Sequence, residues 1–222
     1  MSFIKLWRKH KNLGIKGAFA HWYDRNTRAH RIGEMQAYAR IARKYITENA
    51  DVLEVAPGPG YFTIELAKLG NYHLTGMDIS ADFVDICQVN ALRERITAEF
   101  IQGNVSYIPF ADNYFDFIFC SAAFKNFQEP VRALNEMYRV LKENCTCLIV
   151  DMNHDVTSQA LNEEAAKISQ TGLERWFMKK TFQGLAKGAY TKSELEKMIL
   201  QTPFNKNEII SEGITFFIYL HK

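Results

Sequence analysis

One short stretch constrains the fold of this chain more than any other. The apolar run Val52–Ala56 leads into a turn that contains Gly58 and Gly60. Glycines let the backbone turn sharply and let main-chain N–H groups approach a ligand. A second apolar run ends at Asp78, 18 residues after Gly60. A carboxylate there pairs with ribose hydroxyls in nucleoside-binding β-α-β folds, so the stretch predicts a cofactor site.

From Asp51 onward, short apolar runs alternate with helical stretches. The expected strands are residues 52–56, 72–77, 98–102, 115–120, 145–151, 208–211 and 215–221. Helices are expected after Phe62 and Ala81, and from Glu129 to about Lys142. Strands separated by helices form parallel β-α-β units with right-handed crossovers. The last two strands flank Gly213 and predict a C-terminal antiparallel hairpin. The fold class is therefore α/β, with helices on both faces of a mostly parallel sheet.

Two helical regions depart from this alternation. Residues 1–49 are expected to be helical, after a break at Gly14 and Gly17, because apolar residues recur at three- and four-residue spacing. Those residues are Ile32, Met35, Ala39, Ala42 and Ile46. Residues 153–203 lack strand character. We predict an N-terminal cap over residues 1–49 and a domain over 50–222, with a helical lid insertion at 153–205.

Charge is unevenly distributed along the chain. Residues 1–44 hold eleven lysines and arginines and two acids, a net charge of +9, whereas the remainder carries −7. A basic segment of this kind suits an anionic substrate, a membrane surface or nucleic acid. It is equally the pattern of a solvated helix face docked on the acidic body, and both interpretations stay open.

The four cysteines do not form a metal-binding or redox motif. No Cys-x2-Cys pair exists, and Cys145 and Cys147 stand at strand spacing on one sheet face. Buried thiols in a reducing cytosol are the simpler interpretation, so no metal is expected. The N-terminus lacks a secretory signal, and no run of 18 apolar residues exists. We therefore expect a cytoplasmic protein without a membrane span.

Further motifs follow the glycine-rich turn in a fixed order. Gly76-Met77-Asp78 is followed by Gly103-Asn104-Val105, Ile108-Pro109-Phe110, Tyr114–Ile118 and a helix from Glu129-Pro130 to Lys142. In this order and spacing, residues 50–151 resemble the class I S-adenosylmethionine-dependent methyltransferases, especially the ubiquinone/menaquinone-type and related small-molecule enzymes. The resemblance implies a Rossmann-like seven-stranded sheet, with variable N-terminal and inserted helices capping the active site.

The resemblance also implies a cofactor, S-adenosyl-L-methionine, with S-adenosyl-L-homocysteine as the product, and roles for particular residues. Asp78 would accept hydrogen bonds from both ribose hydroxyls. Ala56 stands where the family usually has the first glycine of the turn. The other implied cofactor contacts are Glu54, Gly58 and Gly60 at the methionine moiety, Ile79, Asn104 and Val105 toward the ribose and adenine, and Ser121 and Ala122 beneath the sulfonium. A helix cap at Asp78 and a turn at Asn104 remain the structural alternatives.

Methyl transfer from a sulfonium needs alignment and desolvation more than acid–base groups. Lys125, in the run Ser121–Phe127, is the candidate catalytic residue, because a cation there binds an acceptor carboxylate or lowers the pKa of a phenol-like hydroxyl. A surface lysine, or one paired structurally with Glu129, is the alternative. The run lacks the Asn/Asp-Pro-Pro-aromatic motif of family members that methylate exocyclic or amide nitrogens, which argues against those acceptors.

Helical residues outside the sheet supply the remaining candidates. Tyr23 is the candidate for a tyrosine over the cofactor, with packing on the core as the alternative. The sequence does not decide whether His30 and Arg31 face the pocket or solvent. The candidate substrate-binding residues of an aromatic lid are Trp176, Phe177, Phe182 and Tyr190. The alternative is that these aromatic residues anchor the insertion to the sheet.

Three functions remain in competition. The first is in-line methyl transfer to a small, partly apolar metabolite at O, N, C or S. The second is tRNA or rRNA methylation guided by the basic segment, and the third is a partner protein that binds the cofactor without turnover. The sequence favours a small-molecule acceptor over nucleic acid. It leaves the acceptor atom and the oligomeric state, a homodimer included, open.

Overall fold

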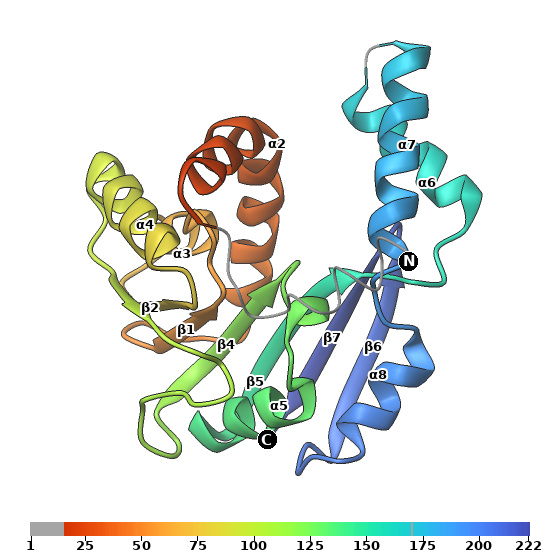
Figure 1. Cartoon of the computed structure of the whole chain (residues 1–222). Helices are drawn as coiled ribbons and strands as arrows, with labels where there is room; N and C mark the ends of the chain where they lie inside the picture. The colour runs from red at the N-terminus through yellow and green to blue at the C-terminus, as the bar shows by residue number, and fades with distance from the viewer. Residues whose placement is uncertain (1–15, 170) are drawn as a thin grey trace.

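A seven-stranded sheet runs through the middle of the molecule, as Figure 1 shows. The computed structural model describes residues 16–169 and 171–222. The strand order is β3-β2-β1-β4-β5-β7-β6. The strands are β1 (Asp51–Val55), β2 (His73–Asp78), β3 (Glu99–Gln102), β4 (Phe115–Ser121), β5 (Leu141–Met152), β6 (Lys206–Glu212) and β7 (Thr215–His221). All pair in parallel except β7, which is antiparallel to β5 and β6, so the expected α/β fold with a terminal hairpin is confirmed.

The strand order reverses between β1 and β4. The chain lays down β1, β2 and β3 outward, and then returns to place β4 on the other side of β1. In open α/β sheets, ligands bind beyond the carboxyl ends of the strands at such a reversal. The topology therefore points to the loops after β1, β2 and β4 as the place for a site.

One face of the sheet is covered by α2 (Ala18–Ala42), α3 (Tyr61–Ala67) and α4 (Ala81–Glu94). Met35, Ala39 and Ala42 are buried at helical spacing, which confirms the helix expected there. The Phe62 ring of α3 stacks on Phe119 of β4 at a centroid distance of 3.9 Å. Gly17, with a φ of 58°, caps the start of α2, and residues 1–15, including Gly14, lie outside the described residues.

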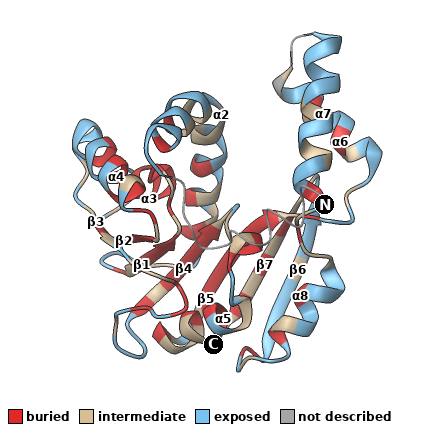
Figure 2. Cartoon of the chain, viewed as in Figure 1, coloured by how far each residue is buried: buried red, intermediate tan, exposed pale blue. Residues whose placement is uncertain are grey.

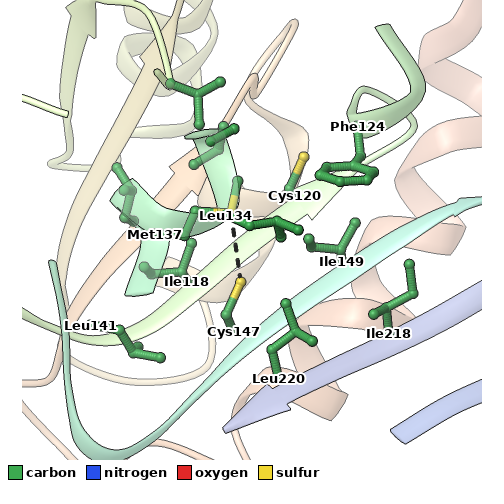
Figure 3. Close-up of a cluster of buried hydrophobic side chains, with 14 of the residues drawn as sticks. Ile118, Cys120, Phe124, Leu134, Met137, Leu141, Cys147, Ile149, Ile218 and Leu220 are labelled. Atoms are coloured by element: carbon green, nitrogen blue, oxygen red, sulfur yellow. Dashed lines mark hydrogen bonds between the residues drawn. The ribbon is translucent and has the colours of Figure 1, made fainter. Parts of the chain in front are cut away.

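The opposite face is covered by α5 (Pro130–Val140), α8 (Lys192–Ile199) and the short 3-10 helix η1 (Phe124–Asn126). Figure 3 shows Leu134 and Met137 of α5 beside Ile118, Cys147 and other side chains of the sheet. Full burial of an aliphatic side chain of this size contributes about 1.5–3 kcal/mol relative to exposure. This cluster holds β4 and β5 together beneath the predicted site.

The helices α6 (Ser158–Ile168) and α7 (Gly172–Ala186) form an arm, residues 158–186, that projects beyond the sheet (Figure 1). They pack mainly on each other, and Figure 2 shows α7 exposed over most of its length. By contrast, α8 returns to the sheet, with Leu195 and Ile199 buried in the core. The helices of the region 153–205 therefore fall into two groups, and the division of the chain into cap, domain and lid remains a prediction.

The boundary between α5 and β5 differs from the sequence-based expectation. The helix was expected to reach about Lys142 and the strand to begin at Cys145. Instead α5 ends at Val140 and β5 begins at Leu141, which pairs with Phe115. Leu141 is fully buried, so tertiary packing draws it into the sheet before the helical pattern of the sequence has ended.

Candidate functional site

The turn after β1 is shaped by positive backbone angles. Gly58 has a φ of 55° and Gly60 a φ of 81°, conformations that L side chains rarely adopt. A Cβ added to Gly60 would lie 3.0 Å from the Cys87 sulfur of α4, whereas one added to Gly58 would meet nothing within 4 Å. Gly60 therefore lets α3 and α4 approach, and Gly58 leaves open space beside its backbone. Ala56, where the family usually has glycine, takes a φ of 54°.

Asp78 lies directly against this turn. Its carboxylate accepts hydrogen bonds from the Gly58 N–H at 3.1 Å and from the Ser80 N–H at 2.9 Å, one to each oxygen. Its side chain is buried, and burial raises the pKa of Asp78 although the backbone hydrogen bonds oppose the shift. A carboxylate offers about four acceptor positions, so both oxygens keep capacity for further donors. Ser80, rather than Asp78, caps α4 by accepting from the Phe83 N–H.

Glu54, on β1, is bound to the start of α3. Its carboxyl accepts from the Thr63 N–H at 3.0 Å and from the Thr63 hydroxyl at 2.6 Å. Burial raises the pKa of Glu54 to about 8, against the effect of both hydrogen bonds. A neutral carboxyl group is therefore favoured at neutral pH, and a cation brought beside it would favour the charged form.

The loop after β3 carries the residues implied for the adenine. The Asn104 side-chain oxygen accepts from the Ser106 N–H at 2.9 Å, the turn geometry that was its structural alternative. Val105 is buried and belongs to the core under the site. Ile79, between Asp78 and the cap of α4, has a carbonyl that accepts from Gln102 at 3.2 Å. These contacts fix the loop conformation and leave the adenine role a prediction.

Arg31, whose orientation the sequence does not decide, reaches the end of β4. The Arg31 guanidinium of α2 donates to the Ser121 hydroxyl at 3.2 Å and pairs with Glu34 at 2.6 Å. The Arg31 side chain is one quarter exposed. Ala122, the next residue in the loop, has a φ of 55°, so two non-glycine residues with left-handed backbone, Ala56 and Ala122, flank the reversal point. Backbone conformations of this kind concentrate at functional sites.

Lys125 is buried rather than exposed on a loop. Its ammonium lies 2.6 Å from the Asp151 carboxylate and donates to the Ala122 carbonyl at 3.0 Å. The other Asp151 oxygen accepts from the Lys125 N–H at 2.9 Å. The structural pairing that the sequence suggested with Glu129 is therefore made with Asp151, while Glu129 pairs with Arg132. Lys125 ties the loop after β4 to the end of β5.

Tyr23 packs on α4, edge-on to Phe83 at a centroid distance of 5.9 Å. No sequence pattern indicates the polar network that begins at the next residue, Asp24. The buried Asp24 carboxylate lies 2.6 Å from the Tyr61 hydroxyl and accepts from Asn90 at 3.1 Å, and Arg28 completes the group. This network joins α2, α3 and α4 behind the glycine-rich turn.

The four aromatic candidates of the insertion occupy different surroundings. Tyr190, just after α7, is partly buried and lies 5.8 Å from the Phe124 ring, next to Lys125. Phe182 is half-buried on α7, whereas Trp176 and Phe177 are 59% and 63% exposed. At a rise of about 1.5 Å per residue, Trp176 lies about 15 Å along the helix from its end at Ala186. Tyr190 thus lies near the site, and the other three lie along the arm.

The described residues fit an adenosyl cofactor at the turn. A buried carboxylate with spare acceptor capacity lies beneath open space at Gly58, and Glu54 and Arg31 supply an acid and a cation at the neighbouring strand ends. A cleft of about 500 Å³ lies elsewhere, between His21 and Arg25 of α2 and Asp85 of α4. The chemistry of the donor set, rather than the size of a cavity, marks the site.

Neither a metal cluster nor a disulfide is found in the part of the chain that the structure describes. No group of three or more potential metal ligands occurs among these residues, and all four cysteines are free. Burial raises the pKa of the Cys120 thiol, which lies within β4. The same residues contain no helix long and apolar enough to cross a membrane.

Comparisons with known proteins agree with this geometry. Residues 53–149 match a family described as a methyltransferase domain. The demethylmenaquinone methyltransferase of Lactiplantibacillus plantarum is 30% identical over 139 residues, which cover 60% of this chain and 59% of that protein. The chain thus spans about three fifths of the length of this curated relative.

Two solved structures share the fold. A SAM-dependent methyltransferase from Aquifex aeolicus superposes with a TM-score of 0.69 at 18% identity, covering 93% of this chain and 98% of that one. The plantazolicin methyltransferase BpumL, in complex with SAH, gives 0.65 at 16% identity, covering 91% and 88%. At such identities the likeness concerns the fold, and it confirms the Rossmann-like architecture that the sequence implied.

Proposed function

We propose that the chain is a class I S-adenosylmethionine-dependent methyltransferase and that it transfers a methyl group to a small, partly apolar acceptor. The observation that carries the proposal is the Asp78 carboxylate, held by Gly58 and Ser80 beneath an open turn at the strand reversal. Such a carboxylate is preorganised for a ribose, because it needs no rearrangement to accept from two hydroxyls.

Bound at this site, the cofactor supplies an activated methyl group on a sulfonium. The residues of the chain would align it: Asp78 would hold the ribose, Gly58 would give room to the methionine moiety beside the tight turn at Gly60, and Asn104 and Val105 would line the adenine. Ser121 and Ala122 would face the reacting centre from the loop that Lys125 ties to Asp151. In this arrangement Lys125 is a positioning residue, because its ammonium already has two partners.

We further propose that Arg31 binds the carboxylate of the methionine moiety. Its guanidinium reaches the end of β4 beside Ser121, and it influences the charge state of Glu54. A charge-assisted hydrogen bond contributes about 1.5–3 kcal/mol. Arg31→Met should therefore weaken binding of S-adenosylmethionine about tenfold or more in calorimetry and leave binding of adenosine, which lacks the carboxylate, unchanged. An equal loss for both ligands would contradict this role.

A quinone-type acceptor is the first to test, because the curated relative from Lactiplantibacillus plantarum is named for demethylmenaquinone. The half-buried Tyr190 offers aromatic surface beside Phe124, and Phe182 lies on α7 of the arm. The protein is incubated with methyl-labelled cofactor and either a demethylated quinol or an RNA and ribosomal-protein fraction. Label in the quinol supports the proposal. Label confined to RNA or protein would overturn it, and cofactor binding with no acceptor labelled would favour a non-catalytic partner.

A further inference from the structure

An apolar stripe on α7 faces away from the protein. Leu173, Trp176 and Phe177 are 78%, 59% and 63% exposed and occupy positions i, i+3 and i+4 of the helix. This spacing puts them on one side, and together they border a shallow hollow of about 380 Å³. An amphipathic helix normally buries its apolar stripe against its own core. Here α7 packs on α6 through its other side, so nothing in the described chain covers the stripe.

One basic residue continues the stripe. Lys180 is exposed four residues after Trp176 and three after Phe177, so it lies on the same side of the helix. Arg175 is also exposed, but its position two residues after Leu173 puts it on the opposite side of α7. Long basic side chains of this kind lay their aliphatic stems along apolar surface and extend their charges beyond it.

A second exposed aromatic pair lies at the start of α2. Phe19 and Trp22 are 57% and 50% exposed, and their rings stack at a centroid distance of 5.3 Å. Arg25, one turn after Trp22, is exposed as well. Figure 1 shows the first turns of α2 and the arm both extending past the end of the sheet at which β4 finishes. Two aromatic and basic surfaces thus flank the mouth of the proposed site.

We propose that these two surfaces dock the protein on an anionic phospholipid surface. Helices with Trp, Phe and Leu on one side and Lys or Arg beside them lie in the interfacial region of a bilayer, where apolar side chains enter and cations contact headgroups. A second copy of this chain is the competing occupant, and light scattering distinguishes it from a lipid surface. The inference rests on the proposed function in one respect: docking would place the site mouth beside a partly apolar acceptor dissolved in the lipid.

The test is co-sedimentation of the full chain with vesicles of phosphatidylcholine alone and of phosphatidylcholine mixed with phosphatidylglycerol. The chain should sediment with the anionic vesicles and release at high salt. Charge contributes about fivefold in partitioning for each basic residue near the surface, so Arg25→Gln with Lys180→Gln should weaken binding more than tenfold. The double variant Trp176→Ser and Phe177→Ser should also lose about tenfold or more, because burying a large apolar side chain is worth at least that factor.

Leu200→Ser is the matched control. Leu200 is 82% exposed at the end of α8, which lies toward the other end of the sheet from the arm (Figure 1), and its replacement should leave sedimentation unchanged. Circular dichroism checks that each variant keeps its helices. If the aromatic variant unfolds the arm, the charge variant still tests the proposal, because it leaves the apolar stripe intact. Phe19→Ser with Trp22→Ser tests the second surface in the same assay.

Three results would overturn the proposal. They are equal sedimentation of all variants, retention on RNA but not on vesicles, and a dimer in light scattering that the Trp176 and Phe177 variant converts to a monomer. Vesicle binding and binding of S-adenosylmethionine are measured separately. A chain that binds the cofactor but not vesicles refutes only the docking, and a chain that binds vesicles but not the cofactor refutes the proposed function.

Discussion

The cofactor half of the molecule, made of β1 to β4 with α2, α3 and α4, and the α6–α7 arm present opposite kinds of surface. In the cofactor half, Asp78 is buried, its two oxygens already bonded to backbone, and Gly60 leaves no room for a methyl group beside Cys87. On the arm, Leu173, Trp176 and Phe177 are mostly exposed. The polar groups of the first surface are held by bonds within the chain, in a shape that suits a small polar ligand. The apolar side chains of the second surface are left uncovered by the residues that the structure describes.

The largest expected effect comes from Lys125, which ties the loop after β4 to the end of β5. Lys125→Met leaves the Asp151 carboxylate buried without its cation, and removing one partner of a buried pair costs about 3–5 kcal/mol of the free energy of unfolding. Denaturant titration measures this loss. Lys179→Met, which removes an exposed hydrogen bond to Ser158 on the arm, is the control and should cost under about 0.5 kcal/mol.

The opposite pattern would change the role of Lys125. If Lys125→Met keeps its stability and cofactor affinity but loses methyl transfer, the ammonium acts on the acceptor and not on the loop. The loop after β4 would then depend less on the Lys125–Asp151 pair for its conformation, and Lys125 would face the acceptor.

Paired glycine substitutions sharpen the comparison. Gly60→Ala forces a side chain into left-handed backbone and against Cys87, which should cost about 1–3 kcal/mol of stability. Gly184→Ala, in the last turn of α7 with nothing within 4 Å of its added Cβ, should gain up to about 1 kcal/mol, because alanine favours a helix. Thermal unfolding followed by circular dichroism measures both. A similar change in stability for the two variants would contradict the left-handed backbone and the close contact with Cys87 at Gly60.

A smaller effect should appear in the pH dependence of cofactor affinity. Burial raises the pKa of Glu54 to about 8, so the free protein holds this proton at neutral pH. A positively charged ligand favours the carboxylate, so binding releases the proton and affinity rises with pH up to about 8, at most about tenfold per pH unit. Calorimetry over this range measures the slope. Glu54→Gln should flatten it, and an unchanged slope in that variant would assign the proton to another group.

The same shift has a consequence for stability. Because the pKa of folded Glu54 lies above its ordinary value near 4.5, the stability that this group contributes is fully present below about pH 4.5. It is lost as the pH rises toward about 8. Glu54→Gln should therefore gain stability relative to the wild type on the alkaline side.

The sequence predicted the cofactor half well because its signals are local. The turn at Gly58 and Gly60 and the acid at Asp78 lie within one β-α-β unit, where strand, turn and helix follow each other along the chain. The hairpin around Gly213 is local in the same way, and Gly213 has a φ of 56°. The end of α5 was missed by two residues because pairing of Leu141 with Phe115 depends on a distant segment.

Contacts between distant segments could not be predicted. Lys125 and Asp151 are 26 residues apart, and Arg31 of α2 is 90 residues from Ser121. No periodicity or motif links such pairs, and they meet only once the strand order is set. The exposure of Trp176 and Phe177 could not be predicted for a different reason: their aromatic pattern is the same whether the stripe faces the core or solvent.

The most direct test of the central claim is a calorimetric titration of the wild type and Asp78→Ala with S-adenosylmethionine, S-adenosylhomocysteine and, as a control, NAD. We predict micromolar binding of both adenosyl ligands to the wild type and none of NAD. Asp78→Ala should weaken adenosyl binding about tenfold to a hundredfold, through loss of charge-assisted hydrogen bonds to the ribose. Undiminished affinity in Asp78→Ala, or wild-type binding of NAD in place of the adenosyl ligands, would contradict the account.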